Sequence, residues 1–179
     1  MVKWLTNQLN RVMERDGAPM NHNDVLRRLR YALDQNDAGV TRLFRIGGLE
    51  LREGELKSYM AKEGDEDFVP CPGRALTAYL DGLVIDRRGP RDPSLPAPPK
   101  ALLDNNLILK KLRIALELQE EDMIAVLDMG GMDVTPSELG ALFRKPDHKH
   151  FRPCGDQLLR NFLNGLTFKF RGVTGSSTD

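Results

Sequence analysis

The sequence predicts an all-α protein made of two tandem, homologous four-helix units packed about a pseudo-two-fold axis. Two observations support this prediction. Apolar residues recur at helical spacing through most of the chain, and residues 23–89 align with residues 106–172 without a gap. Such long self-similarity indicates an internal duplication. We therefore expect the two units to pack as the subunits of a symmetric dimer would, within one chain.

Length and composition limit the class of protein. The 179 residues contain 26 basic and 26 acidic side chains, and 40% of the residues are apolar. The apolar share suffices for a packed core. Because the net charge is zero, any affinity for nucleic acid requires a local basic patch.

The cysteine content and the targeting signals of the sequence indicate in which compartment the protein is found. The two cysteines are too few for a disulfide framework. The sequence shows no signal peptide and no apolar run of bilayer-spanning length. We therefore expect a reduced, cytoplasmic protein that makes no membrane contact.

Residues 1–19 precede the repeat as an N-terminal extension. Apolar residues from Val2 to Met13 fall on one side of a helical wheel, which predicts a short amphipathic helix. A loosely attached extension is the alternative interpretation.

The first repeat, residues 20–89, and the second, residues 106–172, each contain the pattern of four helices. Asn23 and Asn106 occupy positions where the first helix of each repeat needs an N-cap. The third helix of the second repeat has a capping box that begins at Thr135, and the first repeat lacks it. Gly82 and Gly165 lie inside the fourth helices, where we expect close contact between helices.

Two segments outside the repeats have a composition that opposes regular structure. Residues 90–105 form a proline-rich linker, which predicts an extended and semi-rigid connection. The tail, residues 173–179, is rich in small polar residues and is expected to be disordered.

The tandem arrangement resembles the YehS-like family of uncharacterised bacterial proteins. Each half is similar to the domain of unknown function numbered 1456. The resemblance rests on "NNLILKKLRIAL", on "HFRPCGDQLLRNFLNGL" and on their counterparts in the first repeat, and it covers about residues 20–172. It implies a bacterial cytosolic protein. It implies no particular activity.

No residue pattern predicts catalysis, a cofactor or a metal site. His148, His150 and Cys154 are acceptable ligand types, but a fourth ligand is missing and a solvated loop explains the histidines. Cys71 and Cys154 lie near the start of a helix, which can activate a thiol. Structural burial is the favoured interpretation for both cysteines, and an enzymatic role is less favoured than a binding role.

Charge is the clearest difference between the repeats. Residues 60–88 carry four cations and six acids, whereas the matching residues 143–171 carry seven cations and two acids. The sequence therefore predicts an anion-binding surface in the second repeat, next to a helix-turn-helix-like segment at residues 123–145. Its candidate binding residues are Arg144, Lys145, Lys149, Arg152 and Arg160.

Two functions remain open at this point. A regulatory adaptor that binds an unknown protein partner is the main interpretation. Binding of RNA or DNA through the basic surface is the alternative.

Two structural ion pairs are also predicted. Arg30 and Arg113 are equivalent, lie at the edge of an apolar stripe and need acceptors if they are buried. Glu55 and Glu138 are the acidic residues that are identical in both repeats. We therefore expect the pairs Arg30–Glu55 and Arg113–Glu138, or capping of helix-end carbonyl groups by the same arginines.

Overall fold

A computed structural model describes residues 19–94 and 101–172. The expected amphipathic helix in residues 1–18, the central part of the proline-rich linker and the expected disordered tail lie outside the described residues. Every regular element in the described part of the chain is a helix. None of these helices is both long and apolar enough to cross a lipid bilayer.

The helices of the two repeats have nearly the same bounds relative to each repeat. The first repeat contains α2 (His22–Ala32), α3 (Asp37–Ile46), α4 (Glu55–Met60) and α5 (Gly73–Arg88). The second contains α6 (Asn105–Ala115), α7 (Glu120–Met129), α8 (Pro136–Leu142) and α9 (Asp156–Arg171). Helix α6 thus begins at the last residue of the predicted linker, and the all-α, duplicated fold is confirmed.

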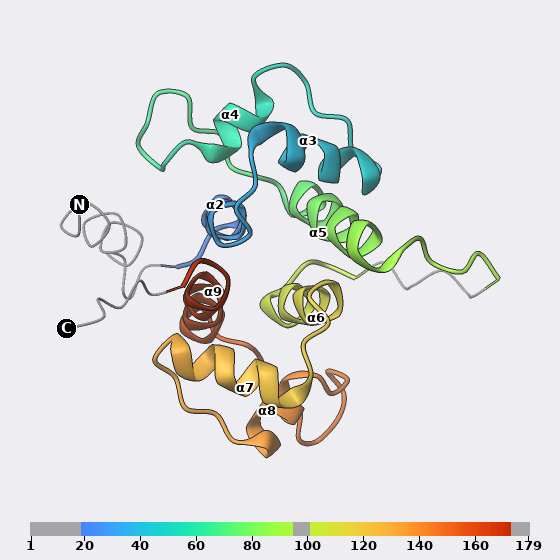
Figure 1. Ribbon diagram of the computed structural model, residues 1–179, viewed down its shortest axis with the longest axis vertical. Coiled ribbons are helices and arrows are strands. Elements are labelled where there is room, and N and C mark those ends of the chain that lie inside the picture. Colours follow the sequence, from blue (N-terminus) through green and yellow to red (C-terminus); the bar gives the residue numbers. More distant parts are fainter. Residues whose placement is uncertain (1–18, 95–100, 173–179) are drawn as a thin grey trace, which may run out of the picture.

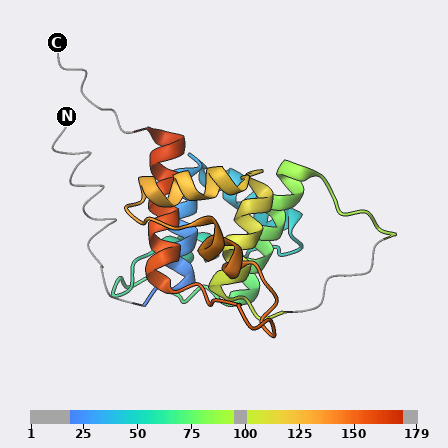
Figure 2. The same ribbon diagram turned by 90° about the horizontal axis from the view of Figure 1, so that it is seen from below.

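The two units share one core. Helix α2 packs mainly against α9, and α6 packs mainly against α5, so the first helix of each repeat contacts the fourth helix of the other. Figure 1 shows these four helices around the centre, with α3 and α4 at one end and α7 and α8 at the other. Seen from below in Figure 2, α9 runs alongside α2. The apolar stripes of the central helices therefore form a contiguous core.

Glycines allow the outer helices to approach the central ones. A Cβ atom added at Gly82 on α5 would lie 1.9 Å from the carbonyl oxygen of Leu43 on α3. A Cβ atom at Gly165 on α9 would lie 1.8 Å from the carbonyl oxygen of Val126 on α7. No side chain fits at such distances, so both glycines are close contact points between helices, as the sequence predicts.

The N-caps differ from the sequence prediction. The side chains of Asn21 and Asp104 cap α2 and α6, whereas Asn23 and Asn106 lie inside the first turn of these helices. The prediction of a capping box at Thr135 is confirmed, because Thr135 and Glu138 bond each other's backbone N–H. Helix α4 follows Gly54, which has a φ of 77° and provides no side-chain cap.

Candidate functional site

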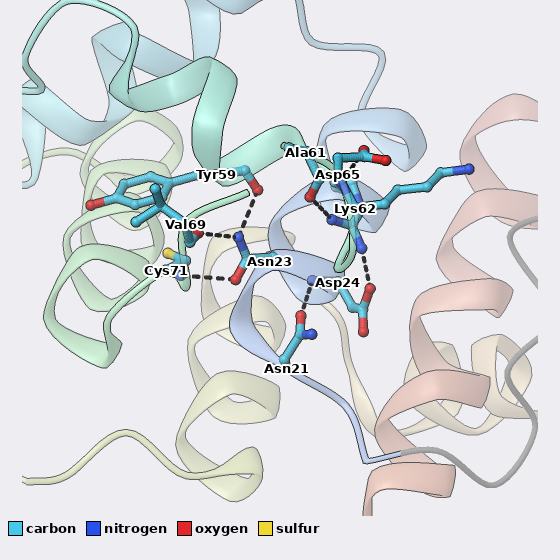
Figure 3. Close-up of polar contacts among 10 residues, drawn as sticks. Asn21, Asn23, Asp24, Tyr59, Ala61, Lys62, Asp65, Val69 and Cys71 are labelled. Carbon is cyan, nitrogen blue, oxygen red and sulfur yellow. Dashed lines mark hydrogen bonds and ion pairs between the residues drawn. The ribbon is translucent and has the colours of Figure 1, made fainter. Parts of the chain in front are cut away.

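One buried asparagine holds both ends of the loop that follows α4. The side-chain Nδ2 of Asn23 donates hydrogen bonds to the carbonyl oxygens of Tyr59 (3.0 Å) and Val69 (2.8 Å), as Figure 3 shows. Its Oδ1 accepts a hydrogen bond from the backbone N–H of Cys71 at 2.8 Å. Asn23 is 1% exposed and bonds with both donors and its acceptor. The loop at residues 61–69, here called the first loop, is therefore clamped at its base.

The second repeat has the same clamp. Asn106 Nδ2 donates to the carbonyl oxygens of Leu142 (2.8 Å) and Arg152 (3.0 Å), and its Oδ1 accepts from the backbone N–H of Cys154 (2.8 Å). It holds residues 144–152, here called the second loop. A single amide side chain that bonds three backbone groups explains why asparagine stands at both positions.

Backbone hydrogen bonds inside the two loops also correspond. In the first loop, the N–H of Asp65 donates to the oxygen of Lys62, and the N–H of Phe68 donates to the oxygen of Asp65. In the second loop, His148 and Phe151 form the equivalent bonds with Lys145 and His148. The two loops therefore share a backbone frame of compact, closed form, a kind of surface loop that often carries function.

The side chains on this common frame have opposite charge. The first loop exposes four acids and one cation, and the second exposes four cations, one acid and two histidines. The acids of the first loop are Glu63, Asp65, Glu66 and Asp67, and the cations of the second are Arg144, Lys145, Lys149 and Arg152. Because α4 and α8 lie at opposite ends of the molecule, the two loops are far apart (Figure 1).

Most cations of the second loop have no acid to neutralise them. Arg152 forms an ion pair with Glu138 at 3.4 Å. Arg144, Lys145 and Lys149 form no ion pair with any other described residue. Two shallow depressions flank Arg144, one containing His148 and Lys149 and the other containing His150 and Arg152. The second loop therefore presents exposed positive charge around two shallow hollows, each of which is also lined by one acid, Asp147 or Glu138.

Arg160 does not belong to this surface, and its place among the predicted binding residues is corrected. It is 4% exposed, and its Nη1 donates to Oε1 of Gln157 at 2.8 Å. The next residue toward the N-terminus, Leu159, belongs to the core. Arg160 was predicted to bind with the loop cations because the sequence reveals its charge but not its burial.

The predicted Arg30–Glu55 and Arg113–Glu138 pairs are wrong. Arg30 pairs with Asp37 at 2.6 Å, and Glu55 instead accepts hydrogen bonds from the backbone N–H of Arg52 and the hydroxyl of Tyr59.

In the second repeat, Arg113 stacks on the ring of Phe143, and its Nε donates to the loop carbonyl of Leu118 at 3.3 Å. That carbonyl precedes α7, so the arginine does not cap a helix end. Glu138 closes the capping box and pairs with Arg152. Each glutamate is held by backbone groups at the start of its own helix, which is the physical reason why it is unavailable to the arginine.

Neither cysteine resembles an active nucleophile. Both are free and buried, and burial raises the pKa of Cys71 and of Cys154 to about 12. His148 and His150 face each other with ring centroids 5.7 Å apart. Within the described ranges, no three side chains of metal-ligand type form a group that could hold a metal ion.

Helix α8 is a poor candidate for reading the major groove of duplex DNA. A recognition helix contacts base edges with its N-terminal residues. Helix α8 spans only Pro136–Leu142, and its one charged residue is the acid Glu138. Arg144 and Lys145 follow the helix, so the positive charge belongs to the loop.

The model of a family described as "Protein of unknown function (DUF1456)" matches residues 22–89 and again residues 105–172. The chain is similar to the "Uncharacterized protein YehS" of Escherichia coli (strain K12), with 42% identity over 148 residues, which cover 82% of this chain and 94% of that protein. No solved structure matches the chain.

Proposed function

The chain belongs to the DUF1456 family of unknown function, and we propose that it is a non-enzymatic adaptor that presents two clamped loops of opposite charge to different partners. The main observation in support of this proposal is that the same asparagine clamp holds an acidic loop in one unit and a basic loop in the other. Loops fixed on a rigid scaffold are frequent binding sites.

The partner of the second loop is an acidic protein segment in this proposal. Arg144, Lys145 and Lys149 are exposed and lack ion-pair partners among the described residues. Charge of one sign on an exposed surface accelerates association with a partner of the other sign and makes binding sensitive to salt. The two free thiols support a reducing, cytoplasmic location for the protein, which is also part of the proposal.

A single-stranded nucleic acid is the second candidate for the same loop. His148, His150 and Phe151 alternate with the cations, and single strands bind proteins through basic grooves with aromatic side chains on which bases stack. The short, acidic start of α8 favours a single strand over a duplex in this alternative.

Direct binding to defined probes tests both candidates. A labelled polyglutamate peptide and a labelled single-stranded oligonucleotide are titrated with the purified protein at low and moderate salt. The adaptor proposal expects tighter binding of the peptide, and replacement of Arg144, Lys145, Lys149 and Arg152 by Ala should weaken it by more than about tenfold. The matched control carries Glu63→Gln, Asp65→Asn, Glu66→Gln and Asp67→Asn in the first loop.

The outcomes separate the two candidates. Tighter binding of the oligonucleotide, lost in the same second-loop variant, would replace the adaptor by a nucleic-acid-binding protein. Equal binding by wild type and second-loop variant would refute both, because the second loop would then carry neither function.

A further inference from the structure

A cavity of about 380 Å³ lies in the first unit at the place where the two units meet. Its walls come from the C-terminal half of α2, the end of α4 and the end of α9. Three guanidinium groups, those of Arg27, Arg30 and Arg171, line it together with Met60 and one carboxylate, that of Asp34. The lining is therefore positively charged, and Arg171 contributes from the second unit.

At the equivalent place in the second unit, an aromatic ring lies against the corresponding arginine. Phe143 corresponds to Met60, and the guanidinium of Arg113 lies 4.8 Å from the centre of its ring. Leu118, which is 5% exposed, stands where the first unit has Gln35 in the cavity wall. The first unit thus has Met60 and Gln35 in the cavity wall where the second unit has Phe143 and Leu118.

Two arginines of the cavity, Arg30 and Arg171, retain hydrogen-bonding capacity. Nε of Arg30 is buried and has no hydrogen-bond partner among the described residues, whereas Nε of the equivalent Arg113 donates to a carbonyl group. Arg27 is held by Asp24 and by the carbonyl oxygen of Ala61. By contrast, Arg30 pairs with Asp37 and Arg171 pairs with Asp34. These carboxylates are 71% and 86% exposed, and exposed ion pairs contribute little stability. A bound anion can therefore compete for both arginines.

We propose that this cavity binds a small phosphate-bearing anion, either free phosphate or a phosphate monoester. Guanidinium groups bond phosphate oxygens through paired N–H donors, and Arg30 and Arg171, whose acids are exposed, can bind one phosphate group together. The volume is within the range of small-molecule sites. The ligand would connect α2 of the first unit with α9 of the second, so binding stabilises the junction between the units.

Isothermal titration with inorganic phosphate at constant ionic strength tests the proposal. Wild type should bind phosphate with a dissociation constant of about 1 mM or below, and its melting temperature should rise with phosphate concentration. Met60→Phe, which copies the second unit, should weaken binding by more than about tenfold. The matched control Phe143→Met should leave binding unchanged.

Two further variants make the test decisive. Arg171→Gln alters the exposed rim and should reduce binding even if Met60→Phe disturbs the fold. Replacement of the four second-loop cations by Ala should leave phosphate binding intact, which separates this site from the proposed adaptor surface. Absence of phosphate binding by wild type, or binding retained in both Met60→Phe and Arg171→Gln, would overturn the proposal.

Discussion

The two loops of this molecule have the same backbone frame and opposite charge. Asn23 and Asn106 form equivalent clamps, and the internal turns correspond bond for bond. Yet the first loop exposes an acidic sequence and the second a basic one. The duplicated units thus keep one backbone frame, whereas the exposed side chains on that frame differ in charge.

The contacts between helices are also equivalent in the two units. Gly82 and Gly165 are equivalent, and each allows a central helix to touch the backbone of an outer helix. The central helices are interlocked across the repeats, because α2 packs on α9 and α6 packs on α5. Neither unit therefore has a complete core of its own, and a defect in one should destabilise both.

The glycine crossings should show the largest effect. Gly82→Ala and Gly165→Ala would each place a Cβ atom within 2 Å of a carbonyl oxygen, and we expect each to destabilise the protein by at least about 3 kcal/mol. Chemical denaturation measures the loss. Gly140→Ala is the control, because its Cβ atom meets nothing within 4 Å and alanine favours a helix by about 1 kcal/mol. A tolerated change at either crossing would contradict the close packing described above.

The asparagine clamps come next. Asn23→Ala leaves two carbonyl groups and one N–H group without their side-chain partner, and we expect a loss of about 3 kcal/mol. Asn106→Ala should cost less, about 2 kcal/mol, because that clamp is partly exposed and water can replace its bonds. Thermal unfolding of both variants tests the order, and equal stability of Asn23→Ala and wild type would remove the clamp from the account.

The two capping glutamates should have a smaller, pH-dependent effect. Hydrogen bonds from the backbone N–H of Arg52 and of Thr135 hold the pKa values of Glu55 and Glu138 below their usual value of 4.5. Such a carboxylate stabilises the fold above its unfolded pKa, and this contribution is lost as the pH falls through the folded pKa. Glu55→Gln and Glu138→Gln should therefore lower stability at pH 7 and flatten its decline below pH 4.5. Unchanged acid profiles in both variants would contradict these roles.

The exposed loop cations should have the smallest effect on stability. Replacing Arg144, Lys145 or Lys149 by Ala should change the free energy of unfolding by less than about 0.5 kcal/mol per site, because none of them forms an ion pair with another described residue. Denaturant titration of the single variants checks this. A loss above about 1 kcal/mol at any of these sites would mean that the charge serves the fold.

The sequence was sufficient to predict the helices of the two repeats, the duplication, the glycine contacts and the inverted loop charge. These features depend on periodicity, on repeated residues or on local composition, all of which are visible in one chain. The cross-packing of α2 on α9 was not predictable, because an apolar stripe does not specify which stripe it will meet.

The hydrogen-bond partners of individual side chains were also not predictable, because the sequence does not specify which groups will lie nearby. Asn23 was interpreted as an N-cap, since its position two residues beyond the true cap, Asn21, cannot be told from sequence. The same residue stands at the equivalent position in both repeats, and this was the sequence signal for the clamp. Arg30 and Glu55 were paired because both recur, but each had a nearer partner in Asp37 and in the backbone of Arg52.

Transfer of one loop sequence onto the other frame tests the central claim most directly. One variant receives residues 144–152 in place of residues 61–69, and a second variant receives the reverse replacement. Both should keep the melting temperature of wild type within a few degrees, because the clamps and turns are common to both frames. Calorimetric titration with a polyglutamate peptide should then find one site in wild type, two in the doubly basic protein and none in the doubly acidic one. Unfolding of both variants, or the same number of sites in all three proteins, would contradict the account.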